Sequence, residues 1–128
     1  MRTFRRVLAI LIGNTDRLAM PVTPGVRSGP AARGGVVSIY ATGLGATEPP
    51  VASGQLSPGG PLAIVTATPT VQIGGQNAAV SFAGLAPGFV GVYQVNAEVP
   101  GGISPGDAVP VVMIQGGVES NTATIAVE

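Results

Sequence analysis

The chain has 128 residues with six basic and six acidic side chains, and it contains no histidine and no cysteine. This length predicts one domain with a modest hydrophobic core. The missing cysteines exclude disulfides, thiol catalysis and cysteine-type zinc sites, and the missing histidines remove the commonest general base.

The balanced charge hides a split along the chain. All six arginines lie in residues 1–33, together with Asp16, whereas residues 34–128 carry five acids and no basic residue. An acidic body of this kind repels a nucleic-acid backbone. We therefore expect no nucleic-acid partner.

Residues 1–33 begin with arginines, continue with the apolar run 7–12 (VLAILI), and end in a Pro/Gly-rich stretch. Arginines before an apolar run outline a signal peptide, but this run falls below the usual minimum of about seven residues and no cleavage site follows. It is also far shorter than the ~20 residues of a membrane-spanning helix. The favoured interpretation is a poorly packed basic leader and linker over 1–33, so that its deletion would leave the thermal midpoint unchanged. A signal peptide and a fragment of an upstream domain remain as alternatives.

Residues 34–128 are rich in valine, and glycine and proline separate their apolar runs. This pattern predicts an all-β fold, an immunoglobulin-like antiparallel β-sandwich of about seven strands. The expected strands are 36–40, 62–67, 70–73, 76–82, 90–99, 108–115 and 121–127. Gly74-Gly75 predicts a two-residue hairpin, residues 41–61 a long loop, and residues 83–88 a turn.

The clearest expected strand, 90–99, alternates apolar and polar residues. Its polar face carries Gln94 and Asn96, which we expect to hydrogen-bond the backbone of the 41–61 loop; a ligand-binding stripe is the alternative. Four aromatic residues, the only ones in 34–128, are expected to anchor the core. They are Tyr40, Phe82, Phe89 and Tyr93.

Three possible functional motifs do not meet the sequence requirements of the sites that they suggest. The Gly43-Leu44-Gly45 stretch lacks the third glycine of a dinucleotide fingerprint, and Pro49-Pro50 stand where its helix would begin. Nothing in the sequence brings Glu98 and Asp107 together as a glycosidase pair, and no calcium-loop spacing is present. We expect no catalytic, cofactor-binding or metal-binding residues, and no cofactor.

Four stretches, taken together, resemble a known family: VSIYATGLG at 37–45, VQIGGQNA at 71–78, GLAPGFVGVYQVN at 84–96 and VPGG at 99–102. They resemble the uncharacterised carboxy-terminal domain of many exported acidobacterial proteins, which is similar to immunoglobulin-like E-set modules of the IPT/TIG kind. The resemblance covers residues 34–128. It departs at Ala41, where the family usually has glycine, and it carries no catalytic residue over.

The resemblance implies a bacterial, extracellular or cell-surface setting. The first functional hypothesis is a non-catalytic structural or adhesive module, whose partners are upstream domains of a longer protein or another surface protein. The alternative is an accessory domain that binds carbohydrate or peptide with the 41–61 loop; an exposed Tyr40 or Phe89 would favour it. We do not expect an enzyme.

Overall fold

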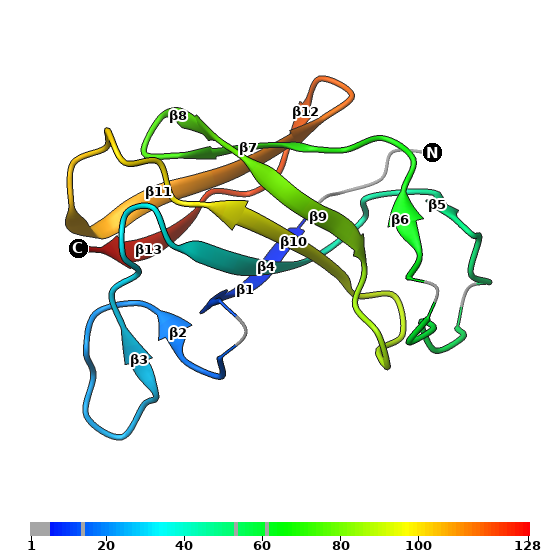
Figure 1. Cartoon of the computed structure of the whole chain (residues 1–128), viewed down its shortest axis with the longest axis horizontal. Coiled ribbons are helices and arrows are strands. Elements are labelled where there is room, and N and C mark those ends of the chain that lie inside the picture. Colours follow the sequence, from blue (N-terminus) through cyan, green and yellow to red (C-terminus); the bar gives the residue numbers. More distant parts are fainter. Residues whose placement is uncertain (1–5, 14, 53, 61) are drawn as a thin grey trace.

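The computed structural model of the chain describes residues 6–13, 15–52, 54–60 and 62–128, which contain thirteen β-strands and no helix (Figure 1). Five of the strands are only two residues long. The strands are β1 (Arg6–Ile12), β2 (Leu18–Ala19), β3 (Ser28–Gly29), β4 (Val36–Thr42), β5 (Thr47–Glu48), β6 (Ile64–Val65), β7 (Thr70–Ile73), β8 (Gln76–Ala78), β9 (Val80–Leu85), β10 (Tyr93–Glu98), β11 (Gly106–Gln115), β12 (Val118–Glu119) and β13 (Ala123–Val127).

The strands form two sheets that pack face to face, which confirms the predicted all-β sandwich. The large sheet has the order β3-β2-β1-β4-β10-β9-β6-β5, and the small sheet has the order β12-β11-β7-β8 with β13 also paired to β11. All pairs are antiparallel except β2 with β3. The largest fully buried side chains come from both sheets and from two residues outside the strands, Leu44 and Val99. All are apolar: Ile39, Leu44, Ile73, Met113, Ile125, Val37, Val71, Val95, Val99 and Val111.

The expected strand over 76–82 is two strands in different sheets. Residues 76–78 form β8 beside β7 in the small sheet, and β9 then pairs with β10 in the large sheet. The chain crosses between the sheets at Ala79, whose carbonyl accepts the Glu98 N–H at 2.9 Å. Residues 83–85, expected in a turn, extend β9 and are buried.

Other boundaries also differ from expectation. Strand β10 begins at Tyr93 because Gly88 and Gly91 both adopt positive φ, which takes the chain out of the extended conformation. The expected strand 62–67 shrinks to β6, and the 41–61 loop contains the short strand β5.

The expectation that residues 1–33 pack poorly is wrong for the part that the structure describes. Strand β1 pairs with β4 from Arg6↔Thr42 to Ile12↔Val37. Val7 and Ile10 belong to the buried core, as do Ala19 of the expected leader and Ala31 of the expected linker. A short run that is apolar on both faces is also typical of a strand inside a sandwich, and that interpretation holds here.

The expectation that aromatic residues anchor the core holds only for Tyr93, which packs against the core cluster; it is wrong for Tyr40, Phe82 and Phe89. Tyr40, Phe82 and Tyr93 are half-buried, and Phe89 is 54% exposed. Branched aliphatic side chains fill the space between the two sheets, so the rings lie at its margin or outside it.

The predicted Gly74-Gly75 hairpin is confirmed, with φ of 62° and 82°. A Cβ on Gly74 would lie 3.1 Å from Cγ2 of buried Ile103. We expect Gly74→Val to lower the free energy of unfolding by more than about 1 kcal/mol, through left-handed strain and this contact. Chemical denaturation measures the change. Gly101→Ala is the control, because Gly101 has no neighbour within 4 Å of its Cβ position; equal effects of the two changes would contradict the prediction.

Candidate functional site

The outer face of the large sheet carries two aromatic rings beside two side-chain amides. Val95 and Ala97 of β10 are fully buried, so Gln94 and Asn96 between them point away from the core. Gln94 pairs in register with Tyr40, and Asn96 pairs with Phe82. Because side chains of paired residues share a face, all four lie together on three adjacent strands, β4, β10 and β9. These four half-buried side chains are named the outer platform.

The two amides of the outer platform bond to each other. Gln94 Nε2 donates to Asn96 Oδ1 at 3.0 Å. The expectation that they satisfy the backbone of the 41–61 loop is therefore wrong, since neither side chain bonds to the described part of that loop. Gln94 Oε1 remains as an acceptor and Asn96 Nδ2 as a donor, and neither has another partner among the described residues.

The Phe82 ring extends over a glycine. A Cβ built on Gly84 would lie only 2.9 Å from Cζ of Phe82, so the tip of the ring lies beside Gly84, which pairs with Gln94. Tyr40, Gln94 and this ring tip thus form one row across the sheet. The two rings are two strand spacings apart, about 10 Å.

Among the described residues, charged side chains lie at the two ends of the outer platform. Exposed Arg6 pairs in register with Thr42 beyond Tyr40, and exposed Glu98 follows Asn96 along β10. The charges are opposite in sign, and the four side chains between them are neutral. The outer platform therefore offers stacking surfaces and hydrogen bonds without a net charge.

The small sheet provides an informative comparison. On its outer face, Gln72 Nε2 donates to Asn77 Oδ1 at 3.3 Å, so it also carries an amide pair. Every aromatic residue of the described chain lies outside the small sheet. The outer platform differs from this face of the small sheet because its amides lie beside aromatic rings.

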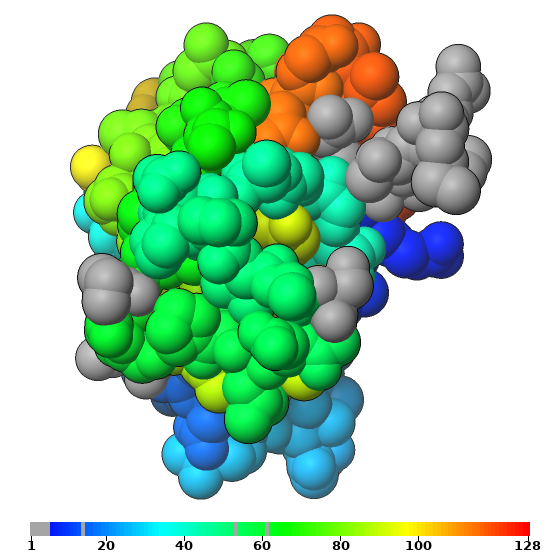
Figure 2. Space-filling view, turned by 90° about the vertical axis from the view of Figure 1, so that its right-hand side faces the viewer, coloured from blue at the N-terminus to red at the C-terminus, as the bar shows by residue number. Residues whose placement is uncertain are grey.

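The 41–61 loop, the binding site of the alternative hypothesis, spreads over one end of the molecule (Figure 2). It forms a hollow of about 120 Å³ together with residues of β9 and β10. The lining residues are Val51, Ala52, Gly54, Gln55, Ser57, Leu85, Gly91 and Tyr93. Ser57 is 4% exposed, and its hydroxyl has no hydrogen-bond partner among the described residues. Exposed Phe89 adjoins the hollow, since its carbonyl accepts the Ser57 N–H at 2.9 Å.

Tyr93 connects this loop to the sheet. Its hydroxyl donates to the carbonyl oxygen of Gly45. Burial raises the pKa of Tyr93 above the usual value for a phenol. The neutral hydroxyl is therefore the form that the fold favours, and it acts as a structural donor.

The buried amide that does satisfy loop backbone is Gln115, at the end of β11. Its Nε2 donates to the carbonyls of Leu44 at 2.9 Å and Ala67 at 2.6 Å, and the residue is 7% exposed. The sequence contains the signal for this role, because Gln115 continues the inward-facing row of Val111 and Met113.

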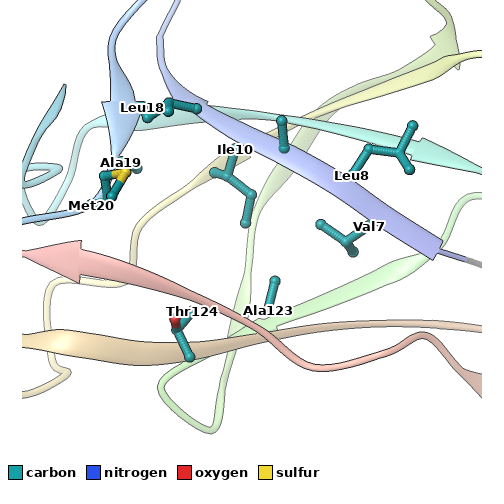
Figure 3. Close-up of a pocket in the computed structure, with 9 residues that line it drawn as sticks. Val7, Leu8, Ile10, Leu18, Ala19, Met20, Ala123 and Thr124 are labelled. Atoms are coloured by element: carbon teal, nitrogen blue, oxygen red, sulfur yellow. The ribbon is translucent and has the colours of Figure 1, made fainter. Parts of the chain in front are cut away.

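A second hollow of about 160 Å³ lies where β1 approaches β13. Figure 3 shows Val7 and Ile10 extending from β1 toward Ala123 of β13, whereas Leu8 points away. At one end Asn121 Oδ1 accepts the Val7 N–H at 2.7 Å, and elsewhere Ala31 bonds to the backbone next to Val127. This apolar seam joins the N-terminal segment to the small sheet.

The rejected catalytic motifs occupy ordinary structural positions. Glu98 ends β10 in the large sheet, and Asp107 is the second residue of β11 in the small sheet; both are exposed. Residues 43–48 lead into β5 and not into a helix. In the described part of the chain, no three acidic side chains gather where they could hold a metal ion, and no helix is long and apolar enough to cross a membrane.

No protein-family model, no curated protein and no solved structure matches this chain.

Proposed function

We propose that this chain is a non-catalytic adhesive module of an exported or cell-surface bacterial protein, and that it adheres through the outer platform. The observation that carries the proposal is the position of Gln94 and Asn96. Their amides lie on an open face between two rings, and each keeps a hydrogen-bonding group for a partner molecule. The phenyl ring of Phe82 and the two side-chain amides have no acidic or basic group for general acid–base catalysis, so these side chains suit binding.

The sequence supports the part of the proposal that concerns an exported or cell-surface bacterial protein. Residues 34–128 resemble the carboxy-terminal domain of acidobacterial exported proteins and, through it, immunoglobulin-like E-set modules. The antiparallel sandwich is compatible with that resemblance. An extracellular module attached to upstream domains would hold its parent protein against a surface or against another surface protein.

Retention of the purified chain on microcrystalline cellulose, chitin and gelatin-coated beads tests the proposal. We expect retention on at least one of these surfaces and a loss of at least tenfold for the double variant Tyr40→Ala/Phe82→Ala. Gln72→Ala, which alters the amide pair without rings, is the matched control and should be retained like the wild type. Circular dichroism verifies that each variant is folded. Equal retention of wild type and double variant, or no retention on any surface, would contradict the proposal.

A second candidate function has its own observation. Phe89 is exposed beside the loop hollow, and the hollow is lined by Ser57, whose hydroxyl has no partner in the described part of the chain. These features suit an accessory domain that binds carbohydrate or peptide with the 41–61 loop. Phe89→Ala in the same assay separates the candidates, because it should reduce retention only if the loop is the binding surface.

A further inference from the structure

We propose that the ligand of the outer platform is a neutral polysaccharide chain that lies across β4, β10 and β9. Tyr40 and Phe82 would each stack on one sugar ring, and the amide pair would hydrogen-bond the sugar between them. This inference rests on the proposed function and assigns its ligand class.

The first argument concerns charge. The outer platform is neutral, and the charges at its two ends, Arg6 and Glu98, have opposite signs. Residues 34–128 contain no lysine or arginine, so β4, β10 and β9 carry no cationic side chain for phosphate, sulfate or uronate groups. Along the outer platform, a polymer with regular negative charge would meet a single described arginine, Arg6, at one end and would be repelled by Glu98 at the other.

The second argument separates a glycan from a peptide. Extended peptides usually bind at the edge of a sheet, where unpaired N–H and C=O groups offer main-chain hydrogen bonds. The outer platform lies over β4, β10 and β9; β4 and β10 are paired on both sides, and β9 is paired with β10 along its length and with β6 at Gly84. Between Tyr40 and Gln94, only side chains are therefore available. A polysaccharide needs only side chains, because its hydroxyls bond to amides and its C–H faces lie on aromatic rings.

The third argument concerns spacing. The rings of Tyr40 and Phe82 are about 10 Å apart because β10 separates their strands. This distance corresponds to roughly two sugar units of an extended chain, so the rings would contact the first and third sugars. Gln94 lies in the same row between the rings. Gln94 Oε1 accepts and Asn96 Nδ2 donates, which matches a hydroxyl group that can do both.

A hollow next to Phe82 lies where the polysaccharide would continue beyond the ring. It has a volume of about 170 Å³ and is lined by Ile64, Thr68, Val80, Ser81, Phe82 and Ala83. Two of these residues carry hydroxyl groups. The polysaccharide would therefore pass Phe82 toward the outer edge of β9 rather than end at the ring.

Affinity electrophoresis of the full chain tests the ligand class. The probes are hydroxyethyl cellulose, xylan and galactomannan as neutral polymers, and polygalacturonate and heparin as charged ones. We expect at least one neutral polymer to retard the wild type and no charged polymer to do so. Tyr40→Ala and Phe82→Ala should each weaken retardation at least tenfold, whereas Tyr40→Phe keeps the ring and should retain most of the retardation.

Calorimetry with oligosaccharides of the retarding polymer should show that a disaccharide binds at least tenfold more weakly than a tetrasaccharide.

The outcomes separate this inference from the proposed function. Retention on gelatin beads that depends on Tyr40 and Phe82, without retardation by any neutral polymer, would overturn the glycan and leave the adhesive role. If Phe89→Ala abolished the retardation and Tyr40→Ala did not, the glycan would bind at the 41–61 loop. That result would overturn the assignment of the glycan to the outer platform. Loss of retention on every surface would overturn both.

Discussion

Deletion of residues 1–33 is expected to abolish the cooperative thermal unfolding of this protein. The deletion removes β1, which pairs with central strand β4 along its whole length. It also removes the buried side chains of Val7 and Ile10, each of which stabilises the fold by about 1.5–3 kcal/mol. A domain of this size has a total stability of only about 5–15 kcal/mol. Differential scanning calorimetry of the truncated and full-length chains measures the effect.

A pair of substitutions in one strand sharpens this prediction. Ile10 is buried at the β1–β13 seam, and its neighbour Leu8 is 53% exposed. Ile10→Ala should lower the free energy of unfolding by about 2–4 kcal/mol, and Leu8→Ala by less than about 0.5 kcal/mol. Equal effects of the two changes, or an unchanged midpoint after the deletion, would mean that the N-terminal segment does not pack as described.

The second large effect is expected at Gln115. Replacing it with leucine keeps most of its volume but removes the donor shared by the carbonyls of Leu44 and Ala67. Buried acceptors without partners each cost about 1–3 kcal/mol, so we expect Gln115→Leu to destabilise the fold by roughly 2–4 kcal/mol. Urea denaturation measures this change in free energy.

Gln94→Leu is the control for Gln115→Leu. Gln94 is half-buried, and its side chain bonds to no described residue but Asn96, so this change should cost less than about 1 kcal/mol. If Gln115→Leu left the free energy of unfolding unchanged, it would contradict the role of Gln115 in joining the end of β11 to the backbone of Leu44 and Ala67.

The sequence predicts much of the sandwich, because two-residue alternation and glycine turns are local signals. Strand 108–115 and the Gly74-Gly75 hairpin appear in the structure nearly as expected. The N-terminal segment does not, because arginines before an apolar run are typical of both a leader and a buried strand. Only the pairing of β1 with β4, a contact between distant parts of the chain, distinguishes the two.

The candidate site was predictable only in part. Alternation along 90–99 correctly placed Gln94 and Asn96 on one face, but sequence could not say what covers that face. The general argument that a buried side-chain amide hydrogen-bonds the backbone of the loop is correct for Gln115 and wrong for these two residues. The position of Phe82 on the outer platform follows only from the register of β9, because the bulge between Phe82 and Val80 changes the alternation of side chains there.

The most direct test of the central claim is an NMR titration that follows side-chain amide signals of the wild-type chain. The ligands are cellohexaose, xylohexaose and mannohexaose, added in turn. We predict that at least one shifts the amide signals of Gln94 and Asn96 most strongly and leaves Gln72 and Asn77 on the small sheet unchanged. Shifts confined to Gln55 in the loop hollow, or no shifts with any of the three, would contradict the claim that the outer platform is the binding surface.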